Sequence, residues 1–207
     1  KVYGAAYIRE LITVYDDMGL LSLDEKGTVK TSGTEIGAFV RLDDLDAGYS
    51  FKELDRSVFM NPDKVNARIV IPITEYKDVV AKHDVDMFLY ANNYEEDGES
   101  LSFFDNVDDA LKVFRAGNRM AKGTTTEYGL VGSYFANPFG PVQRQDQCEP
   151  LLQDYFQRMF DQGVKVGQLR TRLGIKGNEH NGPKEAATEI LKFITGEKEL
   201  KMLEDDE

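Results

Sequence analysis

The sequence predicts an α/β protein with a mixed sheet and flanking helices. After residue 60, segments typical of strands alternate with segments typical of helices. The clearest strand is 68–73, which is rich in β-branched residues. The clearest helix is 106–122, which carries an apolar stripe at helical spacing. This interleaving favours a sheet covered by helices over an all-β architecture.

The first segment of the chain allows two interpretations. Its apolar residues recur at helical spacing, at Ile8, Leu11, Ile12 and Tyr15. The stretch 11–14 is also typical of a buried strand that ends in a turn at 15–19. The β-branched Thr13 and Val14 favour the strand, by only tenths of a kcal/mol each. We expect the strand.

Five further segments have a clear preference for a secondary structure. A short helix is expected at 51–59. Strands are expected at 35–42, 85–90, 128–135 and 164–169. In the first of these strands the apolar residues alternate and share one face, at Ile36, Ala38, Val40 and Leu42.

Three of the four predicted helices have recognisable ends. Asn106 can cap the helix 106–122, with Asp109 at the third position reaching back, and Gly123 stops it. The second helix has Pro150 near its first turn and ends at Gly163. Its inner face comprises Leu151, Leu152, Tyr155, Phe156 and Met159. The last helix spans about 183–194 and ends at Gly196.

Length and composition narrow the class of protein. The chain has 207 residues and a net charge of −12, which disfavours nucleic acid and anionic lipid as partners. No apolar run reaches the roughly 18 residues of a membrane span. A single cysteine, Cys148, fits a reducing cytoplasm. We expect one domain over 1–197 and an acidic tail over 198–207, together forming a piece of a longer protein.

Asp16 and Asp17 are the strongest candidate metal ligands. They follow an apolar run, and two adjacent carboxylates at a strand end suit a hard cation such as Mg²⁺ beside the phosphates of a nucleotide. A solvated turn is the alternative, because the chain holds 37 acidic residues. Two weaker acidic groups are typical of a polar turn and of a helix start: Asp43, Asp44 and Asp46, and Asp105, Asp108 and Asp109.

The other candidate groups carry weaker signals. His83 is expected to be structural, and the role of His180 stays open. Cys148 is expected to be a buried or helix-start thiol rather than a nucleophile. The residues 123–126 could bind an anion, and Arg170 with Arg172 could face a phosphate or lie at a solvated strand end. The sequence contains no GxxxxGK[ST] and no GxGxxG motif.

The order of these features resembles the C-terminal region of ATP-dependent phosphoenolpyruvate carboxykinase. The resemblance spans about residues 11–196 and includes an Asp-Asp turn at 15–19. Its further motifs, in order, are Arg68-Ile-Val-Ile-Pro-Ile73, Val85 to Tyr90, Lys122-Gly-Thr-Thr-Thr-Glu127, Ser133-Tyr-Phe-Ala-Asn-Pro-Phe139, the helix 151–163, Val164-Lys-Val-Gly-Gln-Leu169 and Phe193-Ile-Thr-Gly196.

The resemblance implies a nucleotide-binding domain with a mixed sheet, ATP with Mg²⁺ or Mn²⁺ as cofactors, and Asp16 and Asp17 as metal ligands. The chain departs from the family's pattern at its site. The family's P-loop would fall at or before Lys1. Phe104 stands near the place of a phosphate-contacting arginine, and an aromatic ring cannot neutralise a phosphoryl group. Near the places of three nucleotide contacts stand His180, Asn181 and Ala186.

Two functions follow from the resemblance and its departures. In the first, the chain is part of a divergent carboxykinase-like protein, whose ancestral role is ATP and metal binding with phosphoryl transfer coupled to oxaloacetate decarboxylation. This chain alone is then expected to be inactive, with the upstream part of its parent chain as partner. In the second, the fold serves as a non-catalytic module for nucleotide or metabolite sensing, or for assembly.

Overall fold

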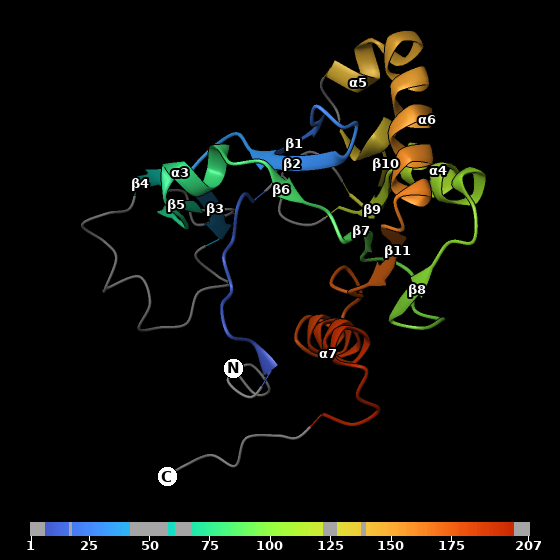
Figure 1. The fold of residues 1–207 in the computed structure, drawn as a ribbon. Helices are drawn as coiled ribbons and strands as arrows, with labels where there is room; N and C mark the ends of the chain where they lie inside the picture. Colours follow the sequence, from blue (N-terminus) through green and yellow to red (C-terminus); the bar gives the residue numbers. More distant parts are fainter. Residues whose placement is uncertain are drawn as a thin grey trace. The chain divides into compact units, whose positions relative to one another are not determined.

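The chain folds into two compact units (Figure 1). The N-terminal unit comprises residues 11–85 and 123–125, and the C-terminal unit comprises residues 1–10, 86–122 and 126–207. Both contain strands and helices, which confirms the expected mixture of α and β structure. The structure, a computed structural model, describes residues 7–16, 18–41, 58–60, 68–121, 128–137 and 140–200.

The described part of the N-terminal unit contains two antiparallel sheets. In one, β2 (Val29–Gly33) lies between β1 (Gly19–Leu23) and β6 (His83–Asp84). In the other, the central strand is β5, with one strand on each side of it. The bounds of this second sheet are β3 (Gly37–Arg41), β5 (Arg68–Pro72) and β4 (Val58–Met60). A short helix, α3 (Tyr76–Val80), also belongs to this unit.

The turn between β1 and β2 is held by Asp24. Its Oδ1 accepts hydrogen bonds from the backbone N–H of Thr28 at 2.8 Å and of Lys26 at 2.9 Å. Short polar side chains that bond the following backbone are typical of tight turns. The backbone hydrogen bond from Thr28 is the main cause that keeps the pKa of Asp24 below its ordinary value.

The N-terminal unit confirms two predicted strands and corrects two other predictions. Strands occur within 35–42 and 68–73, as β3 and β5. The segment 11–15 is neither strand nor helix, so both interpretations of it are wrong. Leu11 is 82% exposed, so its apolar side chain does not pack into a core as either element requires. The predicted helix 51–59 ends instead in strand β4, and its residues 51–57 lie outside the described part of the chain.

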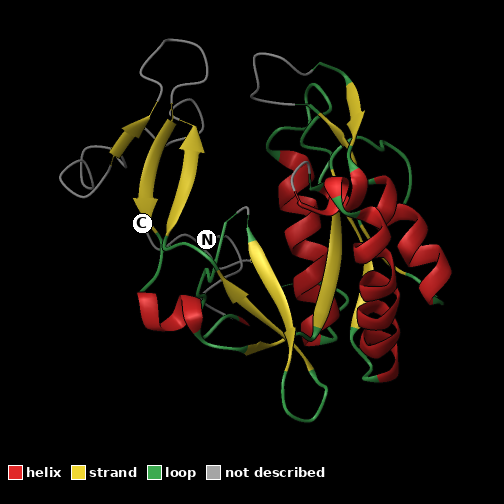
Figure 2. Cartoon of the chain, turned by 90° about the horizontal axis from the view of Figure 1, so that it is seen from above, coloured by secondary structure: helices red, strands yellow, loops and turns green. Residues whose placement is uncertain are grey.

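The C-terminal unit is built on a three-stranded sheet. Strand β11 (Lys165–Arg170) pairs in parallel with β7 (Met87–Asn92) and antiparallel with β8 (Leu101–Phe103). Helices α4 (Val107–Ala116) and α6 (Gln145–Asp161) pack against each other beside this sheet. Helix α7 (Asn181–Thr195) packs against β11 and β8. Figure 2 shows the strands of this unit flanked by helices.

An aromatic cluster joins the sheet to α4 and α6. The rings of Phe88 and Phe114 are stacked, with centroids 5.2 Å apart. Phe156 meets the ring of Phe114 edge-on at 5.0 Å, and Tyr90 meets it edge-on at 5.4 Å. Phe156 is fully buried. Burial of each such side chain contributes about 1.5 to 3 kcal/mol, so these rings form the core of the unit.

Helix α4 begins as predicted and ends earlier than predicted. The side chain of Asn106 accepts the backbone N–H of Asp109 at 2.9 Å and donates to its carboxylate at 2.8 Å, which confirms the cap. The helix ends because Gly117 turns left-handed, with φ of 53°. The chain then forms β9 (Asn118–Met120), where the side chain of Asn93 bonds both backbone groups of Met120.

Three short elements are described between β9 and α6. Strand β10 (Leu130–Gly132) pairs with β9 and covers only part of the predicted strand 128–135. The 3₁₀ turn η3 (Tyr134–Ala136) follows, with Phe135 and Ala136 at φ of 55° and 52°. Two successive left-handed residues with side chains are strained. The four-residue helix α5 (Gly140–Gln143) precedes α6.

Helix α7 and strand β11 confirm their predictions, and helix α6 does so with two exceptions. Leu151 was expected on the inner face of α6 but is 58% exposed, because Leu152, Phe156 and Met159 already form the buried face. Pro150 lies in the interior of α6 rather than near its first turn, so it cannot donate to the carbonyl of Asp146. Gly163 follows α6 at φ of 79°, and Gly196 ends α7 at φ of 71°. Within the described residues, no helix has the length and apolar character that crossing a membrane requires.

Candidate functional site

The candidate site lies at the edge of the sheet where the parallel strands β7 and β11 end. Because the strands run in the same direction, their carboxyl ends lie together. The loop 93–100 leaves β7 at this edge, and the loop 171–180 leaves β11 and leads into α7. Open sheets with parallel strands bind their ligands at such carboxyl ends.

Asn92 fixes the first of these loops. It is the last residue of β7 and is fully buried. Its Oδ1 accepts the backbone N–H of Tyr94 at 3.1 Å and of Glu95 at 3.0 Å. Its Nδ2 donates to the side-chain oxygen of Gln168 on β11 at 3.3 Å. The buried amide therefore joins both parallel strands to the turn that follows β7.

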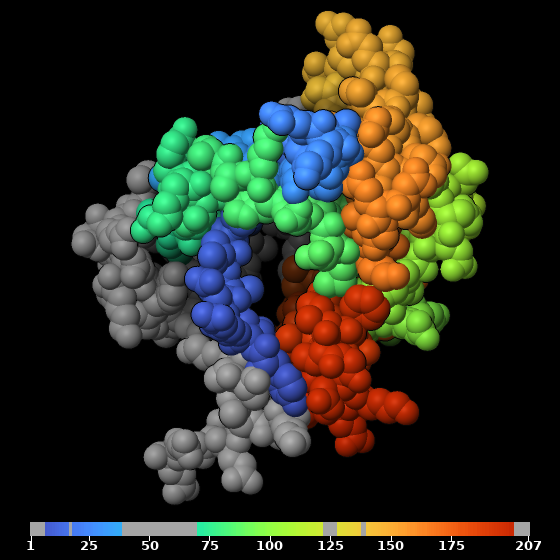
Figure 3. Space-filling model, in the orientation of Figure 1, coloured from blue at the N-terminus to red at the C-terminus, as the bar shows by residue number. Residues whose placement is uncertain are grey.

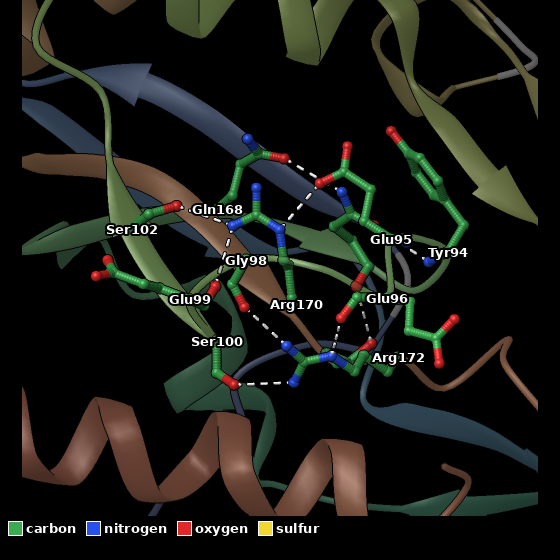
Figure 4. A network of polar contacts seen from close by, with 12 residues as sticks. Tyr94, Glu95, Glu96, Gly98, Glu99, Ser100, Ser102, Gln168, Arg170 and Arg172 are labelled. Atoms are coloured by element: carbon green, nitrogen blue, oxygen red, sulfur yellow. Dashed lines mark hydrogen bonds and ion pairs between the residues drawn. The ribbon is translucent and has the colours of Figure 1, made fainter. Parts of the chain in front are cut away.

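Arg170 holds the same loop from β11 (Figure 4). Its Nε donates to the Glu95 carboxylate at 2.9 Å. Its Nη1 donates to the carbonyl of Glu99 at 3.0 Å and to the hydroxyl of Ser102 at 3.1 Å. The Arg170 side chain is only 14% exposed. Hydrogen bonds of a charged donor inside such a shielded site are stronger than neutral ones.

Arg172 holds the middle of the loop, as Figure 4 also shows. Its guanidinium donates to the carbonyls of Gly98 at 2.8 Å and Glu96 at 2.9 Å. It also donates to the Ser100 hydroxyl at 3.0 Å and to the Glu185 carboxylate of α7 at 3.1 Å. Loop 93–100 and helix α7 are thus connected through one guanidinium.

We call Arg170 and Arg172, with their partners in loop 93–100, the arginine clamp. The sequence left two roles open for these residues, a phosphate contact or a solvated strand end. Both side chains are mostly covered, and their donors bond to the loop. The solvated strand end is therefore wrong. The clamp partly neutralises a loop that carries four acidic residues and gives it a fixed shape.

A groove of about 730 Å³ runs beside α7. We call it the α7 groove. One wall is residues 99–101, and the other is one helical face of α7. Its charged groups include two ion pairs, Glu185 with Arg172 and Lys192 with Glu189. The α7 residues that line it are Asn181, Lys184, Glu185, Thr188, Glu189 and Lys192. The volume is that of a small-molecule site, and α7 lies in red at the surface of its unit (Figure 3).

The positions singled out by the resemblance fall at different places around this groove. Asn181 begins α7 and lines the groove. His180 precedes the helix and is exposed, and its side chain makes no capping bond. Ala186 is 2% exposed and belongs to the buried face of α7. Phe104 is half-buried and lines a second groove beside α4. Of these four residues, only Asn181 contributes to the α7 groove.

The predicted metal ligands are described only in part. Asp16 is exposed and follows a segment that is not a strand, whereas Asp17 lies outside the described residues. The delivery of both carboxylates by a strand end is therefore not found. Among the described residues, no three His, Cys, Asp or Glu side chains are grouped closely enough to hold a metal ion. A metal site at Asp16 and Asp17 stays a prediction.

The weaker acidic candidates for metal binding are also described only in part. Asp108 and Asp109 lie in the first turn of α4, as the helix-start interpretation predicts. Asp105 is exposed beside the α4 helix start. The residues 43–46 and the possible anion-binding residues 123–126 lie outside the described part of the chain. His83 is structural, as expected, because its Nε2 donates to the carbonyl of Asp78 at 2.6 Å.

A polar cluster that sequence reasoning missed joins α4, η3 and α6. The Glu149 carboxylate accepts the Tyr134 hydroxyl at 2.6 Å and also pairs with the guanidinium of Arg115. The Tyr134 hydrogen bond, followed by Arg115, lowers the pKa of Glu149. Burial raises the pKa of the neighbouring Cys148 thiol, which disfavours the reactive thiolate. No sequence spacing signals this cluster, because its members come from three separate elements.

No family model matches the sequence, and no curated protein matches it.

Proposed function

We propose that the chain is the C-terminal, nucleotide-binding region of a divergent protein similar to ATP-dependent phosphoenolpyruvate carboxykinase. The observation that carries the proposal is the α7 groove, at the carboxyl edge of two parallel strands. The resemblance expects nucleotide contacts at the start of the last helix, and Asn181 of that helix lines the groove. The ancestral cofactors are ATP with Mg²⁺ or Mn²⁺.

The groove offers a nucleotide one conspicuous cationic partner. Lys184 lies in the first turn of α7, where the helix dipole favours an anion. Lys192 is paired with Glu189, and Glu185 is paired with Arg172. Glu99 adds a negative charge to the opposite wall. We therefore infer that binding by this chain alone is weak, since most phosphate affinity in such sites comes from a P-loop and its lysine.

The same features support an inactive chain. Phosphoryl transfer needs positive groups that stabilise the charge of the transferred phosphoryl. Arg170 and Arg172 already donate to loop 93–100. Phe104 stands where the resemblance expects an arginine. The missing groups then have to come from the upstream part of the parent chain, which is the expected partner.

The second candidate is a nucleotide- or metabolite-sensing module, or an assembly module, without chemistry of its own. One contact favours sensing. Glu185 lines the α7 groove and also pairs with Arg172, which holds loop 93–100. A ligand that competes for Glu185 would thereby change the hold on the loop. A P-loop upstream in the parent protein would favour the first candidate, and its absence would favour sensing.

Titration with Mg-ATP tests the binding. We expect a dissociation constant above about 0.1 mM, which is far weaker than a micromolar site with a binding free energy of about −8 kcal/mol. Binding should shift the amide NMR signals at the start of α7. The Lys184→Gln variant should weaken binding further. The matched control is Lys176→Gln, in the exposed part of the loop before α7. Shifts confined to other elements, or equal effects of the two variants, would contradict the proposed site.

A coupled assay tests the lack of chemistry. The chain, supplied with oxaloacetate, ATP and Mg²⁺ or Mn²⁺, should form no phosphoenolpyruvate. Turnover that is abolished by Asp17→Asn would overturn the inactivity and would support the predicted metal site instead.

A further inference from the structure

A second groove lies beside α4, separate from the α7 groove. Its volume is about 510 Å³, within the usual range for small-molecule sites. One wall is the face of α4 that carries Asp109, Lys112 and Val113, which recur at helical spacing. The opposite wall comprises Tyr94, Phe104 and Asp105. We call it the α4 groove.

The groove offers two aromatic rings to a ligand. Tyr94 and Phe104 are both half-buried. Phe103 also borders the groove, but its ring packs against Phe193 of α7, with centroids 4.7 Å apart. An aromatic face carries a negative quadrupole and attracts a cation that lies over it. The rings therefore favour a positively charged group that is attached to an apolar body.

The charged residues of the groove favour the same class of ligand. Asp105 and Asp109 supply two carboxylates, and Lys112 supplies one ammonium group, so the lining is net negative. The Asp109 carboxylate is held in place by the side chain of Asn106 at 2.8 Å. The chain as a whole carries a charge of −12, which attracts cations toward its surface. An anion would meet two carboxylates for each lysine.

We propose that the α4 groove binds a small organic cation, an ammonium group on an aromatic or alkyl body. The ammonium lies between the carboxylates of Asp105 and Asp109, and the apolar body packs on Tyr94, Phe104 and Val113. This proposal is independent of nucleotide binding, because the two grooves share no lining residue.

Two probes that differ in charge test the proposal on the full chain. Phenethylammonium and phenylacetate both carry a phenyl ring on a short arm, with opposite charges. We expect phenethylammonium to bind with amide NMR shifts in α4 and at Tyr94, and phenylacetate to bind at least about tenfold weaker, a difference of about 1.4 kcal/mol. Equal binding of the two probes, or no binding of phenethylammonium up to about 10 mM, would overturn the proposal.

Substitutions in the groove locate the site and distinguish a lost contact from a misfolded protein. Asp105→Asn together with Asp109→Asn should weaken phenethylammonium at least about tenfold, about 1.4 kcal/mol. The control Asp108→Asn removes one negative charge from the first turn of α4, beside Asp109 but outside the groove lining. Lys112→Gln should strengthen phenethylammonium binding, and a misfolded protein would not gain affinity. An equal loss in Asp108→Asn, or a loss in Lys112→Gln, would refute the site.

Discussion

Arg170 and Glu95 are joined across the carboxyl edge of the C-terminal unit's sheet, with Nε of Arg170 2.9 Å from Oε2 of Glu95. Glu95 follows β7, and Arg170 ends β11. The same guanidinium reaches the Glu99 carbonyl, so one side chain bonds the loop at two points. This arrangement depends on the planar, forked geometry of arginine, which a lysine does not reproduce.

Arg170→Lys should therefore lower the stability of the protein. The ammonium group keeps the charge but cannot reach the Glu95, Glu99 and Ser102 acceptors together. We expect the free energy of unfolding to fall by about 1 to 3 kcal/mol, measured by urea denaturation. The control is Arg158→Lys, because Arg158 and Asp154 form an exposed pair one turn apart on α6, and such pairs contribute little. Equal losses in both variants would contradict the clamp.

Gly117 and Gly163 both adopt a left-handed conformation and make a matched pair for substitution. A Cβ on Gly117 would lie 2.0 Å from the Ser133 carbonyl oxygen, whereas a Cβ on Gly163 would meet nothing within 4 Å. Gly163→Ala should cost about 1 to 2 kcal/mol, from backbone strain alone. Gly117→Ala should cost about 3 kcal/mol or more, because overpacking is added. Equal midpoint shifts in urea denaturation would show that η3 does not pack closely on the end of α4.

Removal of the α4 cap should have a moderate effect. Asn106→Ala deletes the acceptor of the Asp109 backbone N–H and should lower the free energy of unfolding by about 1 kcal/mol. Asn106→Ser keeps an uncharged acceptor for this N–H and should retain most of the stability. Thermal unfolding of the two variants checks the difference, and a loss as large in Asn106→Ser as in Asn106→Ala would contradict a role for the cap.

The Glu149 cluster should make stability depend on pH. The pKa of Glu149 is lowered in the folded protein, mainly by the hydrogen bond from Tyr134. A carboxyl group with a lowered pKa stabilises the fold at any pH above its pKa in the unfolded chain. This contribution is lost as the pH falls through its pKa in the folded protein. We expect the difference in thermal midpoint between the parent and Tyr134→Phe to be largest at pH 7. The difference should shrink once the pH falls below 4.5, the ordinary pKa of Glu149. A difference that is the same at pH 7 and at pH 3 to 4 would rule out this linkage.

The helices and most strands of the C-terminal unit were predictable because their signals are local. Asn106 indicates a helix start because its own side chain caps the helix, and Gly196 indicates a helix end because its backbone adopts the left-handed conformation. The end of α4 was not predictable in this way. The apolar spacing continues to Met120, but Asn93, from another part of the chain, bonds both backbone groups of Met120 and holds it in a strand.

The candidate sites show the same division. His83 and Asp109 were assigned correctly, because their partners Asp78 and Asn106 lie within five residues in the sequence. Arg170 and Arg172 were left between two roles, because their partners lie some seventy residues away and belong to another loop. The strand expected at 11–14 failed because a preference of tenths of a kcal/mol per residue does not decide a conformation without a buried face.

The parallel pairing of Met87 in β7 with Lys165 in β11 has a consequence for synthesis on the ribosome. Strand β7 emerges well before its neighbour, and α4 and α6 have to be made in between. At roughly 5 to 20 residues per second, β7 waits several seconds without its partner. Phe88 and Tyr90 then lack the sheet that later buries them with Phe114. Faster elongation through this stretch should shorten the exposure and raise the soluble yield, whereas a pause before β11 should lower it.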